Sequence, residues 1–172
     1  LMLQVADYYD HHGTANQQMR AHYLLGCTYR DLGDTPRALE SYMTASDKAD
    51  TLSSNCDYHR LMVIHSQMAE IYSAQSLYNQ EIKEDEVAEG IAWEIKDTLS
   101  AMYFREMQAK IQFYKGNYEK TLELSKDTYR KYLDLGMETK ACLSCSDMIN
   151  VYLKLKDYKN AKKAIDIYGK GL

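Results

Sequence analysis

Two cysteines three residues apart, Cys142 and Cys145, form the most chemically suggestive motif in the chain. A C-x-x-C pair supports redox chemistry when it follows a strand and opens a helix, and zinc binding when two further ligands lie nearby. The surrounding sequence favours a helix without a strand, and Cys27 and Cys56 lie far away along the chain. We therefore expect both thiols to be small apolar fillers of a helical core, with no metal site.

Four histidines occupy positions that packing can explain. His11 and His12 precede Gly13 at an expected helix end, where an imidazole can bond the last carbonyls. His22 and His65 are placed alike in two repeated segments, which indicates a seam between helices, with a pH-sensing role as the alternative. For His11 and His12, a metal role would need a third ligand that the sequence does not place near them.

Four carboxylates are crowded into one short stretch, namely Glu84, Asp85, Glu86 and Glu89. Hydrolysis of the glycosidase type needs two carboxylates that face each other across a cleft. These four would share two turns of one helix, so we interpret the acidic run over 81–97 as a solvated helix face, with an electrostatic docking surface as the alternative. Phosphate loops, H-E-x-x-H and G-x-S-x-G are also absent from the sequence. The sequence predicts a protein that is not an enzyme and uses no cofactor.

Composition narrows the class of protein. Apolar residues make up 45% of the 172 residues and there is one proline, which favours a folded domain of uninterrupted helices. The net charge of -4 argues against nucleic acid as the partner of this domain. Apolar runs are too short for a membrane span, so we expect no membrane contact by this segment.

An internal repeat organises the chain. Its small or apolar anchors are Gly26, Ala69, Ala109 and Ile149, at spacings of 43, 40 and 40 residues. Each repeat is predicted to form two helices joined by a tight turn. We expect a single domain over 1–172, cut from a longer protein, with an unpaired second helix at 1–12 followed by helix pairs at 15–50, 55–96, 98–135 and 138–170.

Residues that typically begin and end helices recur at the boundaries of the repeats. We expect the second helices to begin at Asp34, Asn79, Asn117 and Asp157, because their side chains can cap a free backbone N–H. Ser54 and Asp57 resemble a capping box that opens the second pair. Gly26 and Ala38 would let the two helices of the first pair approach closely, so that Gly26→Leu should overpack the seam.

The first repeat resembles a tetratricopeptide repeat, with Leu25-Gly26, Tyr29, Gly33-Asp34, Ala38, Tyr42 and Ala45 at the family's spacing. The resemblance implies an all-α, right-handed solenoid of antiparallel helix pairs, here with repeats of about 40 residues rather than roughly 34. Such lengthened repeats are similar to those of bacterial peptide-sensing regulators and of envelope-attached proteins. That likeness suggests the periplasmic side of the bacterial cell envelope, with the cytoplasm as the alternative.

In this family the first helices of successive pairs line a concave face that binds peptides or proteins. Aligning the repeats carries that face to Arg20, Tyr23, Cys27, Arg30, Ser66, Glu70, Ser73, Tyr103, Glu106, Lys110, Phe113, Ser146 and Asn150. The mixture suits a protein or peptide partner that is anchored by its side chains. Tyr23 and Cys27 stand where family members that grip a chaperone's terminal carboxylate have lysine and asparagine, so that function is not supported.

Three functions remain open at this point. The resemblance favours a protein- or peptide-binding scaffold, as the sensing or docking module of a longer bacterial regulatory protein. The first alternative is a structural solenoid that forms homo-oligomers through apolar end faces, with Met2, Val5 and Tyr9 at one end and Ala164, Ile165 and Tyr168 at the other. The second is a transcriptional or signalling regulator gated by a small ligand.

Overall fold

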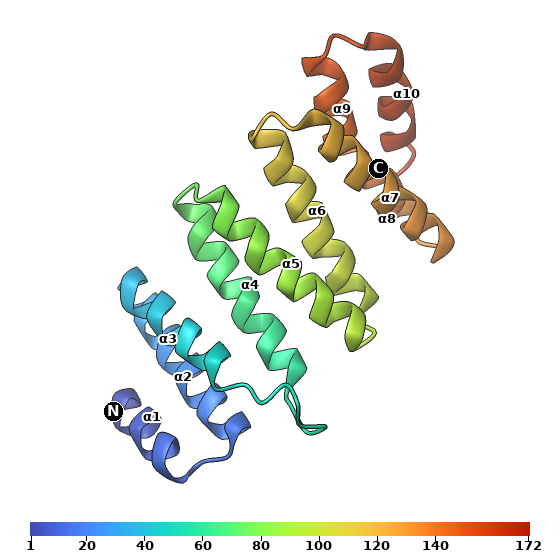
Figure 1. Cartoon of the computed structure of the whole chain (residues 1–172). Helices are drawn as coiled ribbons and strands as arrows, with labels where there is room; N and C mark the ends of the chain where they lie inside the picture. Colours follow the sequence, from blue (N-terminus) through green and yellow to red (C-terminus); the bar gives the residue numbers. More distant parts are fainter. The chain divides into compact units, whose positions relative to one another are not determined.

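The computed structural model describes residues 1–172, and all of its regular elements are α-helices (Figure 1). Two compact units divide the chain, Leu1–Ala101 and Met102–Leu172, and the boundary falls inside one helix. The helices are α1 (Met2–His12), α2 (Ala15–Asp31), α3 (Thr35–Asp47), α4 (Tyr58–Ala74), α5 (Tyr78–Glu94), α6 (Thr98–Tyr114), α7 (Tyr118–Asp134), α8 (Glu138–Leu143), α9 (Ser146–Lys154) and α10 (Tyr158–Tyr168).

A helix of 17 residues followed by a short turn is the building module of the chain. Helices α4, α5, α6 and α7 each have 17 residues. At the end of α6, the amide of Asn117 donates to the carbonyl of Gln112 at 2.8 Å, and the other long helices close with the same bond across five residues. This is the Schellman pattern, which satisfies the last carbonyls and turns the chain back on itself.

Each of these turns needs one residue with left-handed backbone. Glycine supplies it at Gly33, Gly116 and Gly136, with φ between 70° and 78°. Ser76, Lys96 and Lys156 take the same conformation with φ between 56° and 61°, although a side chain makes it costly. The repeated module therefore imposes its turn even where the sequence has no glycine.

The core of the first unit is built pairwise along the chain. Helix α1 packs on α2 through Ala6, Ala21 and Leu25, with Met2 and Tyr9 at the edge of that cluster. Helix α2 then packs on α3, α3 on α4, and α4 on α5. Ile64, Met68, Ala88 and Ala92 are among the buried side chains of the last two helices. Neighbouring pairs thus bury faces that none could bury alone.

Gly26 makes the tightest of these seams possible. A Cβ placed on it would lie 2.6 Å from two ring carbons of Tyr42, whose side chain is fully buried. Ala38 on α3 is buried as well. The close approach predicted from the small residues is therefore present, and the Tyr42 ring is what fills it.

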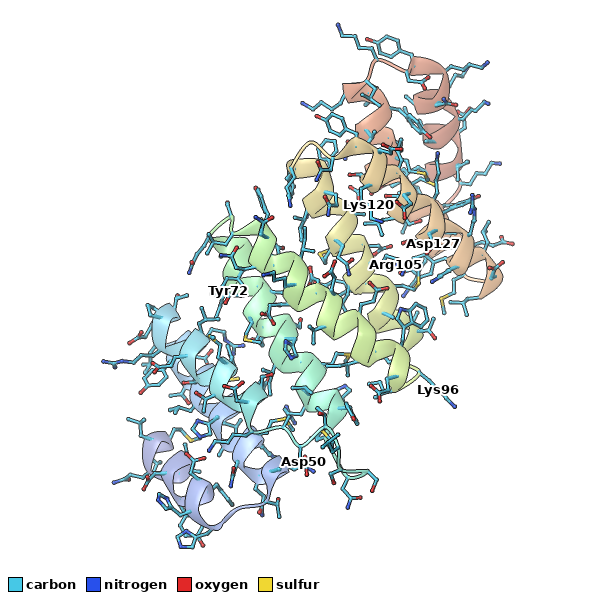
Figure 2. All side chains as sticks on the ribbon, in the orientation of Figure 1. Asp50, Tyr72, Lys96, Arg105, Lys120 and Asp127 are labelled. Carbon is cyan, nitrogen blue, oxygen red and sulfur yellow. The ribbon has the colours of Figure 1, made fainter.

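The second unit has its own core. Met102, Tyr132 and Ala141 form a buried cluster with Tyr129 and Met137 packed against it. Helix α7 contacts α8 and α9, and α9 pairs with α10. Figure 2 shows Arg105 of α6 beside Asp127 of α7, and the two form an ion pair that ties these helices together.

Helix starts follow the predicted chemistry in part. Asp34 and Asp157 cap α3 and α10, each accepting from the backbone N–H three residues on. Asn117 precedes α7, but its side-chain amide donates to the Gln112 side chain and does not cap the helix. The prediction for Asn79 was wrong, because α5 starts after Leu77. The Ser54 capping box was also wrong, since Asp57 itself caps α4 through Arg60 N at 2.9 Å.

The acidic stretch of α5 is not the solvated face that its charge suggested. Glu81, Asp85 and Glu89 are at most 8% exposed and succeed one another at intervals of four residues, so they lie on one buried stripe of the helix. Of the four carboxylates considered from the sequence, only Glu86 is exposed. The interpretation of the whole run as bulk-solvated was therefore wrong.

Candidate functional site

The first helices of successive pairs carry the residues expected to bind a partner. We call the surface of α2 and α4 the first-helix face of the first unit, and that of α6 and α9 within 102–172 the first-helix face of the second. The predicted residues are exposed or half-buried throughout both faces. Their assignment to partner binding stays a prediction, and the two faces are described separately.

Tyr23 on α2 is joined to α4 by an arginine. The guanidinium carbon of Arg60 lies 4.8 Å from the centre of the Tyr23 ring, within cation–π range. Tyr23 also faces Tyr42, with ring centres 6.0 Å apart. Burial raises the pKa of Tyr23, so the phenol stays neutral and remains a hydrogen-bond donor.

Gln67 on α4 is the hub of a hydrogen-bond network across the two helices. Its Oε1 accepts from Arg30 Nη1 at 2.5 Å and lies 3.4 Å from the Tyr42 hydroxyl. Its Nε2 donates to Glu70 Oε2 at 3.1 Å. The Tyr42 hydroxyl is also 3.6 Å from Cys27 Sγ. Four of the predicted residues, Tyr23, Cys27, Arg30 and Glu70, are therefore linked through Arg60, Tyr42 and Gln67.

The remaining predicted residues of the first unit do not join this network. Arg20 and Ser73 are exposed, and Ser66 is half-buried. Arg30 is held from its own helix as well, since Nε and Nη2 donate to Asp31 Oδ1 at 3.1 and 2.9 Å. The network thus includes three of the predicted residues on α2, but only Glu70 of those on α4.

The first-helix face of the second unit centres on two half-buried carboxyls, Glu106 on α6 and Asp147 on α9. Burial raises the pKa of Glu106, and repulsion from Asp147 adds to that rise, while a hydrogen bond from Tyr132 opposes it. Burial also raises the pKa of Asp147, against the attraction of Lys110. Burial, and then the interaction with Glu106, raise the pKa of Tyr132 to about 12.

Aromatic side chains flank these carboxyls along α6. Tyr103 is 46% exposed and meets Phe104 edge-on, with ring centres 5.4 Å apart. Phe113 is half-buried, and its ring centre lies 5.7 Å from that of Tyr118 at the start of α7. Ser146 and Asn150 are exposed on α9. The face combines apolar rings with carboxyls and an amide, which are groups that can bind a peptide side chain.

Sequence reasoning missed four residues of these faces, namely Arg60, Gln67, Tyr132 and Asp147. Gln67 and Asp147 directly follow the predicted Ser66 and Ser146, so a repeat alignment shifted by one position would have found both. Tyr132 belongs to a second helix, and Arg60 to the first turn of α4. Neither has a signal in the alignment of first helices.

Seam histidines hold neighbouring helices together beside these faces. His22 Nε2 lies 3.0 Å from Asp10 on α1, and Lys48 Nζ contacts the same carboxylate at 2.8 Å. His65 Nδ1 lies 2.6 Å from Glu84 Oε2, and its Nε2 lies 3.2 Å from Ser46 Oγ. The partners of His65 come from α3 and α5, so this bonded row fixes three helices.

Helix-end histidines bond carbonyls as expected. Nδ1 of His11 and of His12 lie 2.8 and 3.0 Å from the carbonyl oxygens of Asp7 and Tyr8. No group of three or more His, Cys, Asp or Glu residues is arranged to hold a metal ion. None of the helices is both long and apolar enough to span a membrane.

Comparison with known proteins identifies the type of repeat. Residues 20–47, which cover most of α2 and all of α3, match the family model of the tetratricopeptide repeat. Comparison with curated proteins found no match.

Solved structures share the fold over almost the whole chain. A Podosopora anserina protein with nearly identical, kinesin-light-chain-type TPR-like repeats has a TM-score of 0.75 at 12% identity, over 99% of this chain and 83% of its own. BtubC from P. vanneervenii gives 0.72 at 15% identity, over 97% and 67% of the two chains. Aspartyl phosphate phosphatase F from Bacillus subtilis gives 0.69 at 14%, over 90% and 39%.

At these identities the likeness establishes the fold alone. The predicted fold class, an all-α array of helix pairs of the tetratricopeptide type, is confirmed.

Proposed function

We propose that this chain is a non-enzymatic scaffold that binds a peptide segment of another protein along its first-helix faces. We further propose that it acts as the sensing or docking module of a longer bacterial regulatory protein. Repeat folds of this type commonly serve as protein-interaction scaffolds. The observation that carries the proposal is the network around Gln67, which joins the exposed groups of α2 and α4 into one surface.

Pre-arranged side chains lower the entropic cost of binding. Gln67 and Asp31 hold the guanidinium of Arg30 while it remains exposed, which leaves it N–H donors for a ligand. Arg60 is likewise held over the Tyr23 ring. A partner that meets these groups pays little to order them, which supports their role as anchors.

The charges of the two faces favour different anchors on the partner. On the first-helix face of the first unit, Arg20, Arg30 and Arg60 outnumber Glu70 and Asp31, so a carboxylate is the side chain that suits this face. The half-buried carboxyls of Glu106 and Asp147 on the second unit suit a cationic or hydrogen-bonding side chain. We therefore expect acidic anchors on a partner of the first face, and cationic or hydrogen-bonding anchors on a partner of the second.

Capture from a cell lysate tests this proposal. We would immobilise the chain and its Tyr23→Ala/Lys110→Ala variant and identify the retained proteins by mass spectrometry. The parent should retain partners that the variant loses. The matched control is Lys83→Ala/Lys126→Ala, which removes exposed lysines from the second helices α5 and α7.

Circular dichroism must show that both variants are folded. Equal retention by the parent and the Tyr23→Ala/Lys110→Ala variant would reject the first-helix faces as the working surface. Equal losses in both variants would reject them too, because the effect would then belong to charge removal in general.

Self-association is the second candidate, and the last helix pair favours it. Leu153, Leu155, Tyr158 and Ile165 are between 46% and 66% exposed on α9, its following turn and α10. At the other expected end face, Met2 and Tyr9 already pack against α2. Sedimentation over a range of concentrations would show a mass increase that Ile165→Lys abolishes, and a constant monomer mass would exclude this function.

A further inference from the structure

The long helix of the last pair is interrupted at the C-x-x-C motif. Helix α8 ends at Leu143 and α9 begins at Ser146, so the break falls on Ser144 and Cys145. The amide of Cys145 donates to the carbonyl of Cys142 at 3.2 Å, three residues back, where a regular α-helix would reach four residues back to Ala141. The turn that holds the two cysteines is therefore tightened toward a 3₁₀ turn.

Side chains at the motif account for this local geometry. The Ser144 hydroxyl donates to the carbonyl of Ala141 at 2.8 Å, and Cys145 Sγ lies 3.7 Å from the same oxygen. Serine and cysteine side chains thus take up the acceptor that the Cys145 amide would otherwise use. Such back-bonding competes with the helical ladder and bends helices.

A tightened turn brings the two thiols onto one side of the chain. In a 3₁₀ turn the side chains at positions i and i+3 eclipse each other, whereas in an α-helix they are offset. Residues three apart in a helical turn also have Cα atoms within the range that a disulfide accepts. Both thiols are free in the structure. The motif therefore meets the backbone condition for a cross-link without a change of fold.

The two thiols differ in access. Cys145 is completely buried, while Cys142 is half-buried. Gly171, after α10, packs over Cys142 so closely that a Cβ added to it would be 2.7 Å from the Cys142 Cβ. An external reagent should therefore reach Cys142 first, past the residues that follow α10.

We propose that Cys142 and Cys145 form a reversible disulfide by exchange with a small external disulfide such as glutathione disulfide. The Cys142 thiolate attacks one external sulfur, the external S–S bond breaks, and one small thiol leaves. The Cys145 thiolate then attacks Cys142 Sγ, the mixed disulfide breaks, and the second small thiol leaves. Two protein thiols are oxidised, one external disulfide is reduced, and each protein thiol loses one proton.

Burial of Cys145 limits the rate of the second step, in which its thiolate attacks Cys142 Sγ. Burial, with the neighbouring Cys142 adding to it, raises the pKa of Cys145 to about 11, so little of it is thiolate at neutral pH. Closure should therefore accelerate as pH rises toward that value. Oxidation also removes the thiol proton that Cys145 directs at Ala141, so the geometry of the break must respond.

The break lies directly before Ser146 and Asp147 of the second unit's first-helix face. If the proposed binding function holds, the disulfide places a redox control next to that face. The cross-link itself does not depend on that function, and the two are tested by different readouts.

Intact mass and peptide mapping test the cross-link on the full chain. The reduced protein is incubated with glutathione disulfide at mildly alkaline pH, quenched with acid and digested with trypsin. Both cysteines fall in the single tryptic peptide 141–154, so the expected product is that peptide with two hydrogens lost and no added glutathione. Dithiothreitol should restore the original mass.

Two variants identify the order of attack. Cys145→Ala should stop at a stable glutathione adduct on Cys142, and Cys142→Ser should leave Cys145 unmodified. A wild-type protein that retains glutathione on Cys142, or that leaves peptide 141–154 reduced while other cysteines react, would overturn the proposal. Failure of the reduced protein to capture any partner, with the cross-link formed as expected on oxidation, would count against the binding function alone.

Discussion

Asp85 is the most deeply buried charged side chain of the protein. It is 3% exposed, and its Oδ2 is buried without a hydrogen-bond partner. Burial first, and then the neighbouring Glu81, Glu84 and Glu89, raise its pKa from 3.8 to about 7. The folded protein therefore keeps a proton on this carboxyl that the unfolded chain releases at much lower pH.

Removing this carboxyl should stabilise the protein near neutral pH. Between the unfolded and folded pKa values the native state binds more protons, so the free energy of unfolding falls as pH rises toward about 7. Asp85→Asn should abolish that decline and raise stability at pH 7 by on the order of 3 kcal/mol. Urea denaturation across this window measures it.

Glu86→Gln serves as the control for Asp85→Asn, because Glu86 is exposed on the same helix. It should leave the pH profile of the free energy of unfolding almost unchanged. A profile for Asp85→Asn that retains the wild-type decline would show that Asp85 does not cause it.

Gly26 offers a second test at the scale of single residues. Glycine to alanine in a helix normally stabilises, but here the new methyl would sit 2.6 Å from the buried Tyr42 ring. We expect Gly26→Ala to destabilise by about 1–3 kcal/mol, and Gly26→Leu by at least as much.

Gly90 on α5 is the matched control, since nothing lies within 4 Å of a Cβ built on it. Gly90→Ala should stabilise by about 0.5–1 kcal/mol, the normal gain for a helix interior. Changes of the same sign at both glycines would contradict this account of the seam.

The side chains show where reading the sequence succeeds and fails. Gly26 and Tyr42 stand out because a small and a large residue recur at helical spacing. Asp85 does not, because a charge normally predicts exposure and only the interval of four from Glu81 to Asp85 to Glu89 hints at a buried stripe. Gln67 was missed because the alignment followed one row of the helix, whereas a binding face is wider than one row.

At the scale of elements, the turns between helices are more regular than their sequences. Ser76, Lys96 and Lys156 adopt the left-handed conformation that glycine adopts at Gly33 and Gly116. The turns could be predicted where a glycine marks them. Elsewhere the length of the helical module sets the turn, which no single residue reveals.

Lys96, labelled in Figure 2 at the turn after α5, tests the cost of this conformation. Lys96→Gly should stabilise the protein by roughly 0.5–1 kcal/mol, because it relieves a left-handed penalty of about 1–2 kcal/mol at some cost in unfolded-chain entropy. Thermal or chemical denaturation measures the change.

The reverse substitution supplies the control for the turn. Gly116 has φ of 78° and open space around it, so Gly116→Lys adds strain without a clash. It should destabilise by about 1 kcal/mol. Stabilisation by Gly116→Lys would rule out backbone strain as the governing factor.

The interruption between α8 and α9 is the element that the sequence did not predict. Helical periodicity runs through residues 138–154, and the break arises from Ser144 and Cys145 competing for the Ala141 carbonyl. Competition of this kind depends on side-chain rotamers. A hydrophobic pattern does not contain them.

For the molecule as a whole, most of the fold could be predicted from the sequence repeat alone. Successive anchors such as Gly26 and Ala69 fall one helix pair apart, and a helix pair must stack to bury its apolar face, so the architecture followed from spacing. The division at 101 and 102 could not be foreseen, because it falls inside α6 and no proline, glycine or change of composition marks it.

The two first-helix faces, proposed to bind a partner, were predictable only as a set of positions. The network that connects Tyr23, Arg30 and Glu70 runs through Tyr42 and Gln67, and it depends on how α2, α3 and α4 are placed. The proposed function therefore depends on an arrangement of two repeats rather than on a motif.

The most direct test of the central claim is the affinity of a peptide selected against this chain from a random display library. We would measure its dissociation constant for the wild type, for Arg30→Ala/Gln67→Ala and for the control Lys83→Ala. The account predicts that the double variant binds at least roughly 30-fold more weakly, about 2 kcal/mol, while the control binds like the wild type. Equal affinity for all three proteins would contradict the claim that the first-helix face around Gln67 holds the partner.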